Sequence, residues 1–319
     1  MKPRCWQLAI PGLIMVTGCA QLLSRSAMSS GMVTGVPFEM GGGYIITEVV
    51  VDDSPPLDFI FDTGSSGTVL NARAARELGI VGTDSVTIPG GAATGAADLV
   101  RSYGHVVRFG DAELRDAPVV IADMEHIERR IGRTFDGVIG WPILSQWAVW
   151  INQDTKRIEL FDNRRFGYDL GTAPLELEMR GRGIHTSATV VLQNGEQHTG
   201  SVLIDTGFGG SVSFLHGFAQ EAHLLTEADP ASRQTTQSLS TDTEAYYTFM
   251  LSELSIGEHS MGPLRSRVPE RGGGTAGPSR TMGIVGIEVL KRFNIFLDLE
   301  HLKMFLEPSH FHDEPFGSG

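Results

Sequence analysis

A triplet of residues that occurs twice constrains this 319-residue chain more than any other feature. Asp-Thr-Gly stands at 62–64 and again at 205–207, 143 positions later. Each copy follows an apolar run that is typical of a β-strand, LDFIF at 57–61 and VLI at 202–204. The chain therefore carries the same strand-and-loop pattern in both of its halves.

The residues around the two triplets repeat as well. GVIG at 137–140 corresponds to GIVG at 283–286, and PFEM at 37–40 corresponds to PLEL at 174–177. Composition predicts roughly 0.16 Asp-Thr-Gly triplets by chance in such a chain. Two triplets with matching flanks indicate a duplicated domain, and a repeat of this kind decides the fold before any other signal.

Most of the secondary structure expected from the sequence is strand. Runs of β-branched and aromatic residues between turn signals predict strands at 44–51, 57–61, 103–109, 188–192, 202–204 and 245–251. The dipeptide Asn194-Gly195 predicts a tight hairpin turn. Apolar residues at helical spacing predict two short helices, at 72–78 and 215–225. The sequence therefore predicts an all-β fold, mainly β with a few short helices.

The composition limits the classes of function. With 41% hydrophobic and 20% charged residues, the chain is expected to fold rather than to be disordered. Its formal charge of −13 argues against nucleic acid as a partner and against electrostatic binding to anionic lipid. Two cysteines cannot form a four-cysteine metal site, and the histidines show no HExxH pattern. We therefore expect no metal and no cofactor.

The N-terminal residues are typical of a targeting segment. Residues 1–18 combine a basic start with an apolar run too short to span a bilayer, which predicts a signal peptide. VTGC at 16–19 resembles a bacterial lipobox, which implies that Cys19 is acylated; the alternative is an ordinary secretory signal with a chance cysteine. Ala20 then implies export to the periplasmic face of the outer membrane, with residues 19–34 as a flexible tether.

On the motifs at 61–66 (FDTGSS), 204–207 (IDTG), 137–140 and 283–286, the chain resembles the two-lobed, pepsin-like aspartic proteases. Each lobe is similar to a retropepsin subunit, and the resemblance extends over about residues 35–307. It implies two homologous β-barrel-like lobes with one active site at their interface, in a monomer that takes a polypeptide substrate. The corresponding signal peptide, tether, two lobes and flexible tail lie at 1–18, 19–34, 35–165, 166–308 and 309–319.

The resemblance assigns one catalytic aspartate to each lobe, Asp62 and Asp205. Hydrolysis of an amide without a metal or a covalent intermediate needs a base that activates water and an acid that protonates the carbonyl oxygen. Two carboxyl groups about 3 Å apart cannot both ionise, so they share one proton and supply both functions. Their titration is then a property of the pair.

The same resemblance implies that five neighbouring residues support the two aspartates. The N–H groups of Gly64 and Gly207 are expected to donate to the carboxylates from tight turns. Thr63 and Thr206 resemble the threonines that hydrogen-bond across the lobe interface in this family. The hydroxyl of Ser65 is expected to donate to the first aspartate.

Two departures from the family pattern affect these expectations. Phe208 follows the second triplet, where many two-lobed members have Ser or Thr, so we expect the two aspartates to lie in unequal environments. The candidate flap at 88–99 contains no tyrosine. A second-lobe counterpart is expected within 234–249, where Tyr246 and Tyr247 approach the cleft.

Two functions from different classes are consistent with these motifs. The first is an aspartic endopeptidase that acts on proteins of the bacterial cell envelope. The alternative is a catalytically weak or inactive relative that binds peptide strands in the same cleft by main-chain pairing. Because both aspartates, both threonines and both glycines are present, the sequence favours the enzyme.

Overall fold

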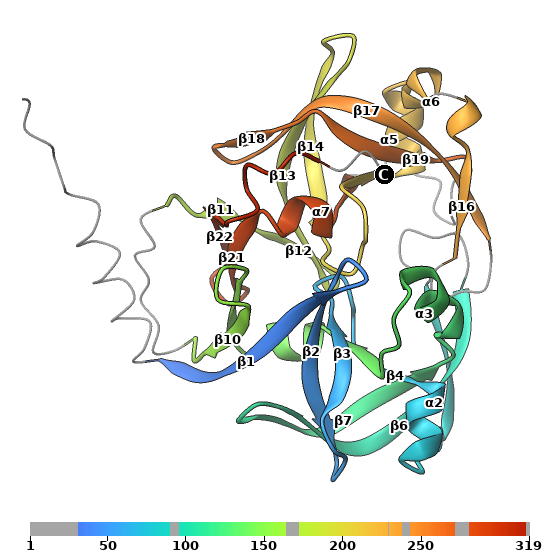
Figure 1. Ribbon diagram of the computed structural model, residues 1–319, viewed down its shortest axis with the longest axis vertical. Coiled ribbons are helices and arrows are strands. Elements are labelled where there is room, and N and C mark those ends of the chain that lie inside the picture. Colours follow the sequence, from blue (N-terminus) through green and yellow to red (C-terminus); the bar gives the residue numbers. More distant parts are fainter. Residues whose placement is uncertain are drawn as a thin grey trace, which may run out of the picture.

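The two halves of the chain form two lobes, which lie one above the other in Figure 1. The structure is a computed structural model, and it describes residues 31–89, 96–163, 172–228, 230–237, 243–271 and 281–316. The first lobe runs from blue to green and the second from yellow to red, and strands dominate both. The expectation of a two-lobed all-β fold with a few short helices is confirmed.

In the described part of the first lobe, short helices lie between the strands. Its described elements are β1 (Met32–Gly41), β2 (Tyr44–Val51), β3 (Leu57–Phe61), β4 (Thr68–Asn71), α2 (Ala72–Glu77), β5 (Asp84–Pro89), β6 (Ala96–Phe109), β7 (Ala112–Ala122), α3 (Glu125–Ile131), β8 (Gly137–Ile139), α4 (Trp141–Leu144), β9 (Ala148–Asn152) and β10 (Arg157–Phe161).

The second lobe follows the same pattern of strands and short helices. Its described elements are β11 (Leu175–Glu176), β12 (Glu178–Arg180), β13 (Gly183–Leu192), β14 (Gln197–Ile204), β15 (Val212–Phe214), α5 (His216–Glu221), α6 (Leu224–Glu227), the 3₁₀ turn Pro230–Ser232, β16 (Gln234–Thr236), β17 (Glu244–Ile256), β18 (His259–Met261), β19 (Leu264–Pro269), β20 (Thr281–Val285), α7 (Ile287–Leu290), β21 (Phe293–Asp298) and β22 (Lys303–Pro308).

The strand pairing around the two triplets is the same in both lobes. β3 pairs in parallel with β8, and β14 pairs in parallel with β20. β4 and β15, which come after the triplets, lie antiparallel to β8 and β20. Gly140 follows β8, and a Cβ on it would lie only 1.9 Å from the carbonyl oxygen of Asp62. Gly286 follows β20, and a Cβ on it would lie 2.3 Å from the carbonyl oxygen of Gly210. Only glycine lets the chain pass this closely behind each aspartate loop.

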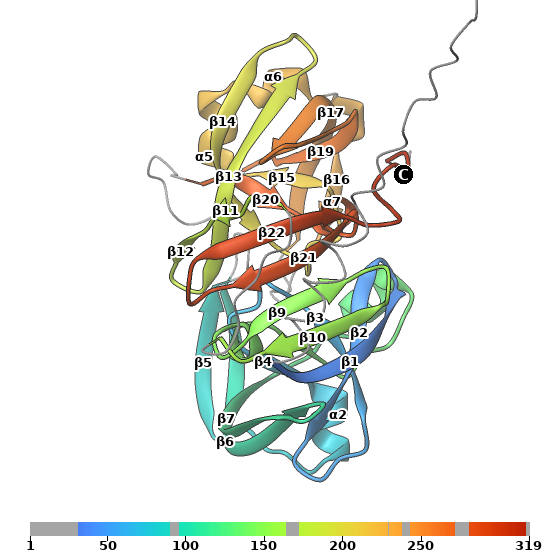
Figure 2. The same ribbon diagram turned by 90° about the vertical axis from the view of Figure 1, so that its left-hand side faces the viewer.

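The two lobes share a sheet. The larger sheet has the order β11-β22-β21-β9-β10-β1-β2-β3-β8-β4-β7-β6-β5, and β9 of the first lobe pairs antiparallel with β21 of the second. Figure 2 shows these strands side by side across the junction. One face carries a buried cluster of Trp150, Phe161, Phe296 and Phe305. Backbone hydrogen bonds and apolar burial therefore hold the lobes together along β9 and β21.

The second sheet belongs to the second lobe alone. Its strands have the order β12-β13-β14-β20-β15-β19-β17-β16, and β18 pairs with β17. The turn at Asn194 and Gly195 joins β13 to β14, as the sequence predicts. The helix predicted at 215–225 is instead two short helices, α5 and α6. His223 between them has a left-handed backbone with φ of 53°, which ends the first helix.

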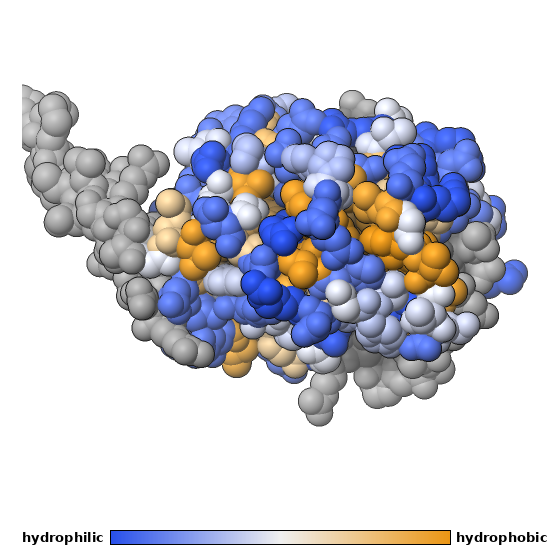
Figure 3. All heavy atoms as spheres, turned by 90° about the horizontal axis from the view of Figure 1, so that it is seen from below, coloured by the Kyte–Doolittle hydropathy of each residue, from blue (hydrophilic) through white to orange (hydrophobic). Residues whose placement is uncertain are grey.

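The boundary of the first lobe differs from the sequence prediction. β1 begins at Met32, and Thr34 pairs with Leu160, so the last residues of the tether predicted at 19–34 are part of the lobe. Cys19 lies outside the described residues. In the part of the chain that is described, no helix is long and apolar enough to cross a membrane. Hydrophilic side chains cover much of the face seen from below, with hydrophobic groups between them (Figure 3).

The C-terminal segment is held against the second lobe, in contrast to the frayed tail expected from its sequence. Residues 310–313 form turns, and the segment contacts the guanidinium of Arg292. This guanidinium donates to the carbonyl oxygens of Phe311 and His312, at 3.2 and 2.9 Å, and lies 3.7 Å from the ring centroid of Phe316. One buried arginine therefore orders a segment that has no periodic pattern of its own.

Candidate active site

Asp62 and Asp205 meet where the two lobes touch. Asp62 follows β3, and its N–H donates to the carbonyl of Ile139 on the parallel strand β8. Asp205 follows β14, and its N–H donates to the carbonyl of Val285 on the parallel strand β20. The glycine of each triplet packs against the carboxyl group of the opposite lobe. A Cβ on Gly64 would lie 2.6 Å from Cγ of Asp205, and a Cβ on Gly207 would lie 2.2 Å from Cγ of Asp62. Only glycine at both positions lets the two loops approach so closely.

Backbone donors hold both carboxylates in the same way. The N–H of Gly64 donates to Oδ1 of Asp62 at 2.8 Å, and the N–H of Gly207 donates to Oδ1 of Asp205 at 2.9 Å. Each aspartate therefore accepts a bond from the residue two positions further along its own loop. This fixes the orientation of the carboxyl group toward the lobe interface, as the sequence predicts for both glycines.

The two threonines link the lobes through four reciprocal hydrogen bonds. The hydroxyl of Thr63 donates to the carbonyl of Ile204 at 2.8 Å, and that of Thr206 donates to the carbonyl of Phe61 at 2.8 Å. Each hydroxyl also accepts the N–H of the opposite threonine at 3.0 Å. Both side chains are buried, with 1% of their surface exposed. The bonds give a partner to both buried hydroxyls, to both threonine N–H groups and to both carbonyls.

The environment of the pair raises the proton affinity of both carboxyl groups. Burial raises the pKa of Asp62 above its ordinary value, although hydrogen bonds to Asp205 and to backbone N–H groups act to lower it. Burial raises the pKa of Asp205 well above its ordinary value, and the negative charge of Asp62 raises it further. The arrangement therefore keeps one proton on the pair at pH values where isolated aspartates are ionised.

Comparison with known proteins agrees with this geometry. A family model described as aspartyl protease matches residues 47–143, which contain the first triplet. The crystal structure of an aspartic proteinase from Irpex lacteus matches with a TM-score of 0.54 and 14% sequence identity, covering 89% of this chain and 99% of that one. Residues 47–143 thus match the aspartyl protease family, and the chain as a whole has the fold of a pepsin-like aspartic proteinase. No curated protein matches the sequence.

Ser65 differs from the role expected by analogy with this family. Its hydroxyl donates to the carbonyl of Gly67 at 3.0 Å rather than to the carboxylate of Asp62. Its backbone N–H, however, acts on the carboxylate of Asp62 and lowers its pKa, and the N–H of Phe208 does the same for Asp205. In both lobes the donor is a backbone N–H. Phe208, which has no hydroxyl, therefore leaves Asp205 with the same kind of donor that Asp62 has.

The candidate flaps of both lobes are antiparallel hairpins. β5 pairs with β6 up to Pro89 and Ala96, and residues 90–95 of the predicted flap lie outside the described residues. In the second lobe β16 pairs with β17, which confirms a hairpin within the predicted range 234–249. The hydroxyl of Tyr246 donates to Gln234 and that of Tyr247 donates to Glu270. Neither hydroxyl contacts the aspartate pair in this arrangement.

A second group of hydrogen-bonded residues in the first lobe looks like a Ser-His-Asp triad. The Nε2 atom of His105 lies 2.8 Å from Oγ of Ser102, and Nδ1 lies 2.8 Å from Oδ2 of Asp52. Ser102 is buried, with 6% of its surface exposed, and the pairing of β6 with β7 shifts register between Ser102 and His105. The group therefore fixes an irregularity in the sheet and presents no accessible nucleophile.

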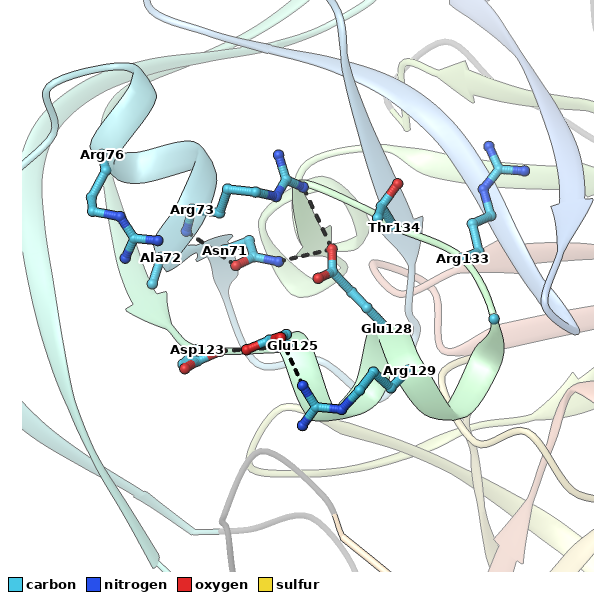
Figure 4. A pocket seen from close by; sticks show the side chains of 11 residues that line it. Asn71, Ala72, Arg73, Arg76, Asp123, Glu125, Glu128, Arg129, Arg133 and Thr134 are labelled. Atoms are coloured by element: carbon cyan, nitrogen blue, oxygen red, sulfur yellow. Dashed lines mark hydrogen bonds and ion pairs between the residues drawn. The ribbon is translucent and has the colours of Figure 1, made fainter.

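The first lobe also has a polar pocket of about 580 Å³ between α2 and α3 (Figure 4). It does not include the aspartate pair, and ion pairs cross it. Arg73 pairs with Glu128 at 3.4 Å, and Arg129 pairs with Glu125 at 2.7 Å. Among the described residues, no group of His, Cys, Asp and Glu could hold a metal ion. The aspartate pair is therefore the site with the clearest chemistry.

The threonine junction can be tested by removing one hydroxyl. Thr206→Val keeps the shape of the side chain but leaves the carbonyl of Phe61 and the N–H of Thr63 buried without partners. Each such group costs about 1–3 kcal/mol, so we expect the two together to lower the free energy of unfolding, measured in urea, by about 2–6 kcal/mol. Thr206→Ser should lose less because it keeps the hydroxyl.

Thr199→Val is the matched control, because Thr199 offers its hydroxyl to an exposed pair with Thr189. This control should change the free energy of unfolding by less than about 0.5 kcal/mol. An unfolding midpoint of Thr206→Val equal to that of the wild type would contradict a structural role for the junction.

Proposed function

We propose that the chain is an aspartic endopeptidase that hydrolyses peptide bonds in polypeptides between Asp62 and Asp205. The observation that carries the proposal is the convergence of two equivalent aspartate loops, one from each lobe, with both pKa values raised. These loops are supported by Thr63, Gly64, Thr206 and Gly207. Ser65 contributes through its backbone N–H. The family match and the pepsin-like fold support a peptidase in general.

In the proposed reaction one proton is shared by the pair. In the order proposed here, Asp205 carries the shared proton and Asp62 is the carboxylate; burial raises the pKa of both groups. Asp62 takes a proton from water while the water oxygen attacks the carbonyl carbon, and Asp205 gives its proton to the carbonyl oxygen. In the next step Asp62 protonates the nitrogen, the C–N bond breaks, and Asp205 takes back a proton from the diol. The products are a carboxylic acid and an amine, and the pair regains its starting state.

We propose further that the enzyme works in the bacterial cell envelope, anchored by lipid on Cys19. The support comes from the sequence, in the apolar segment followed by VTGC at 16–19. β1 begins at Met32, so a short stretch of chain separates the anchor from the first lobe. A protease tethered in this way meets exported proteins and envelope proteins as substrates.

Cleavage of an unfolded protein tests the proposed reaction. Purified wild-type chain should release peptides from the substrate, and Asp62→Asn and Asp205→Asn should each reduce kcat/KM by about 10²–10⁴-fold. A peptide inhibitor with a statine residue, whose hydroxyl imitates the tetrahedral diol, should block cleavage. The rate should fall as the pH rises through the raised pKa of the pair, because the second carboxyl then loses the shared proton.

The control is Asp53→Asn, which alters an exposed carboxylate in the turn after β2. It should cleave like the wild type. Equal cleavage by the wild type and both aspartate variants would contradict the protease, and binding of peptides without cleavage would favour the peptide-binding alternative.

Metabolic labelling with a palmitate analogue tests the anchor. The wild-type chain should become labelled and enter the membrane fraction, whereas Cys19→Ser should remain unlabelled, because acylation needs the thiol. Cys5→Ser is the control, since Cys5 lies inside the predicted signal peptide and is removed with it. Equal labelling of wild type and Cys19→Ser would exclude the lipid anchor.

A further inference from the structure

Arg267 lies in an unusual setting on β19 of the second lobe. Its guanidinium is placed between two aromatic rings, 4.2 Å from the ring centroid of Phe208 and 5.0 Å from that of Tyr246. Its Nε donates to Oγ of Ser213 at 3.0 Å. The two rings and this bond fix the plane of the guanidinium, while the residue as a whole keeps partial exposure.

No carboxylate of the described residues forms an ion pair with Arg267, although several other arginines of the chain have such a partner. Arg73, Arg133 and Arg233, for example, each pair with at least one carboxylate. Burial lowers the pKa of Arg267, and the more distant negative charge of Glu244 raises it. The two terminal nitrogens accordingly have no acceptor among the described residues, although a poorly solvated cation is stabilised by a bonded anion.

The position of Arg267 links it to the aspartate pair. Phe208, on which it stacks, directly follows Gly207, where an added Cβ would lie 2.2 Å from Cγ of Asp62. The next residue, Gly209, meets the first lobe, since a Cβ there would lie 2.5 Å from the hydroxyl oxygen of Tyr44. The charge environment of Arg267 includes Tyr44 as well. Arg267 therefore lies at the junction of the lobes, beside the second aspartate loop.

A second cation of the first lobe reaches the same region. Arg130 on α3 donates to Oγ1 of Thr236 at 3.1 Å and to the carbonyl of Gln237, both on the hairpin of the second lobe. Its positive charge also acts on Arg267. In a chain with a formal charge of −13, two cations therefore approach each other at this side of the junction, with Glu244 as an acidic neighbour.

We propose that Arg267 determines specificity by binding a carboxylate side chain of the substrate, in a subsite beside Phe208. The inference rests on the proposed function, because it assumes that a peptide lies along the aspartate pair. A guanidinium fixed between two rings presents its terminal N–H groups in a plane, which suits the two oxygens of a carboxylate. The enzyme then prefers Asp or Glu at one position near the scissile bond.

Binding of uncleavable peptides tests this preference without any need for catalysis. The probes are statine peptides in which one Glu is moved along the positions on either side of the statine, each paired with a twin that has Gln instead. Calorimetry with the wild-type chain should show one position at which Glu binds about tenfold more tightly than Gln. This ratio should fall to about one in Arg267→Gln and should survive in part in Arg267→Lys.

Arg265→Gln is the matched control, because Arg265 is an exposed arginine on the same strand, two residues away. It removes the same charge and should keep the Glu preference. Arg267→Glu should reverse the selectivity, so that a Lys peptide at the same position binds better than the Glu peptide. Equal melting temperatures of the variants would show that Phe208 and its loop keep their structure.

The outcomes separate this inference from the proposed function. A wild-type chain that binds the Glu and Gln twins equally at every position overturns the inference, even if it cleaves proteins through the aspartate pair. A Glu preference that persists in Arg267→Gln overturns it as well. So does a variant that loses the binding of both the Glu and the Gln peptide, because Arg267 would then serve only to hold Phe208 in place. A Glu preference that depends on Arg267 in a chain without cleavage supports the inference and rejects the protease.

Discussion

The reciprocal hydrogen bonds between Thr63 and Thr206 are the constraint on which the rest of the site depends. Each hydroxyl accepts an N–H from the other lobe and donates to the carbonyl of the residue before the opposite aspartate. Because all four bonds are buried, any displacement of one lobe leaves polar groups without partners, which is costly in a dry junction. The shared sheet through β9 and β21 brings the lobes together, and the threonines set the positions of the aspartates.

Much of this architecture could be predicted from the sequence, because the motif itself dictates it. The glycine of each triplet must lie against the opposite carboxyl group, and the glycines at 140 and 286 must lie behind the loops, so a repeat of both implies two lobes and one site. Other features depend on contacts between distant residues. The stacking of Arg267 on Phe208, and the hold of Arg292 on the C-terminal segment, join residues that carry no motif and no periodic pattern.

The departures from the family pattern have a common physical cause, since backbone groups replace side chains. The sequence predicts unequal aspartates because Phe208 has no hydroxyl, yet the hydroxyl of Ser65 turns away to Gly67. Both carboxylates rely on N–H groups of their own loops instead. Burial raises the pKa of both carboxyl groups, and the charge of Asp62 adds to this effect at Asp205. Because no hydroxyl is needed at position 208, this position can have a phenylalanine ring, on which Arg267 stacks.

The central claim is that the two carboxyl groups share one proton. Carbon-13 NMR of chain labelled at Cγ of aspartate measures this directly, as the carboxyl carbon shifts when its proton leaves. We expect one ionisation of the pair well above the ordinary pKa of about 3.9 for aspartate. In Asp205→Asn that ionisation should disappear and the pKa of Asp62 should fall, because the charge of its partner is gone. Two ionisations near the ordinary value, each unchanged when the other aspartate is replaced, would contradict the account.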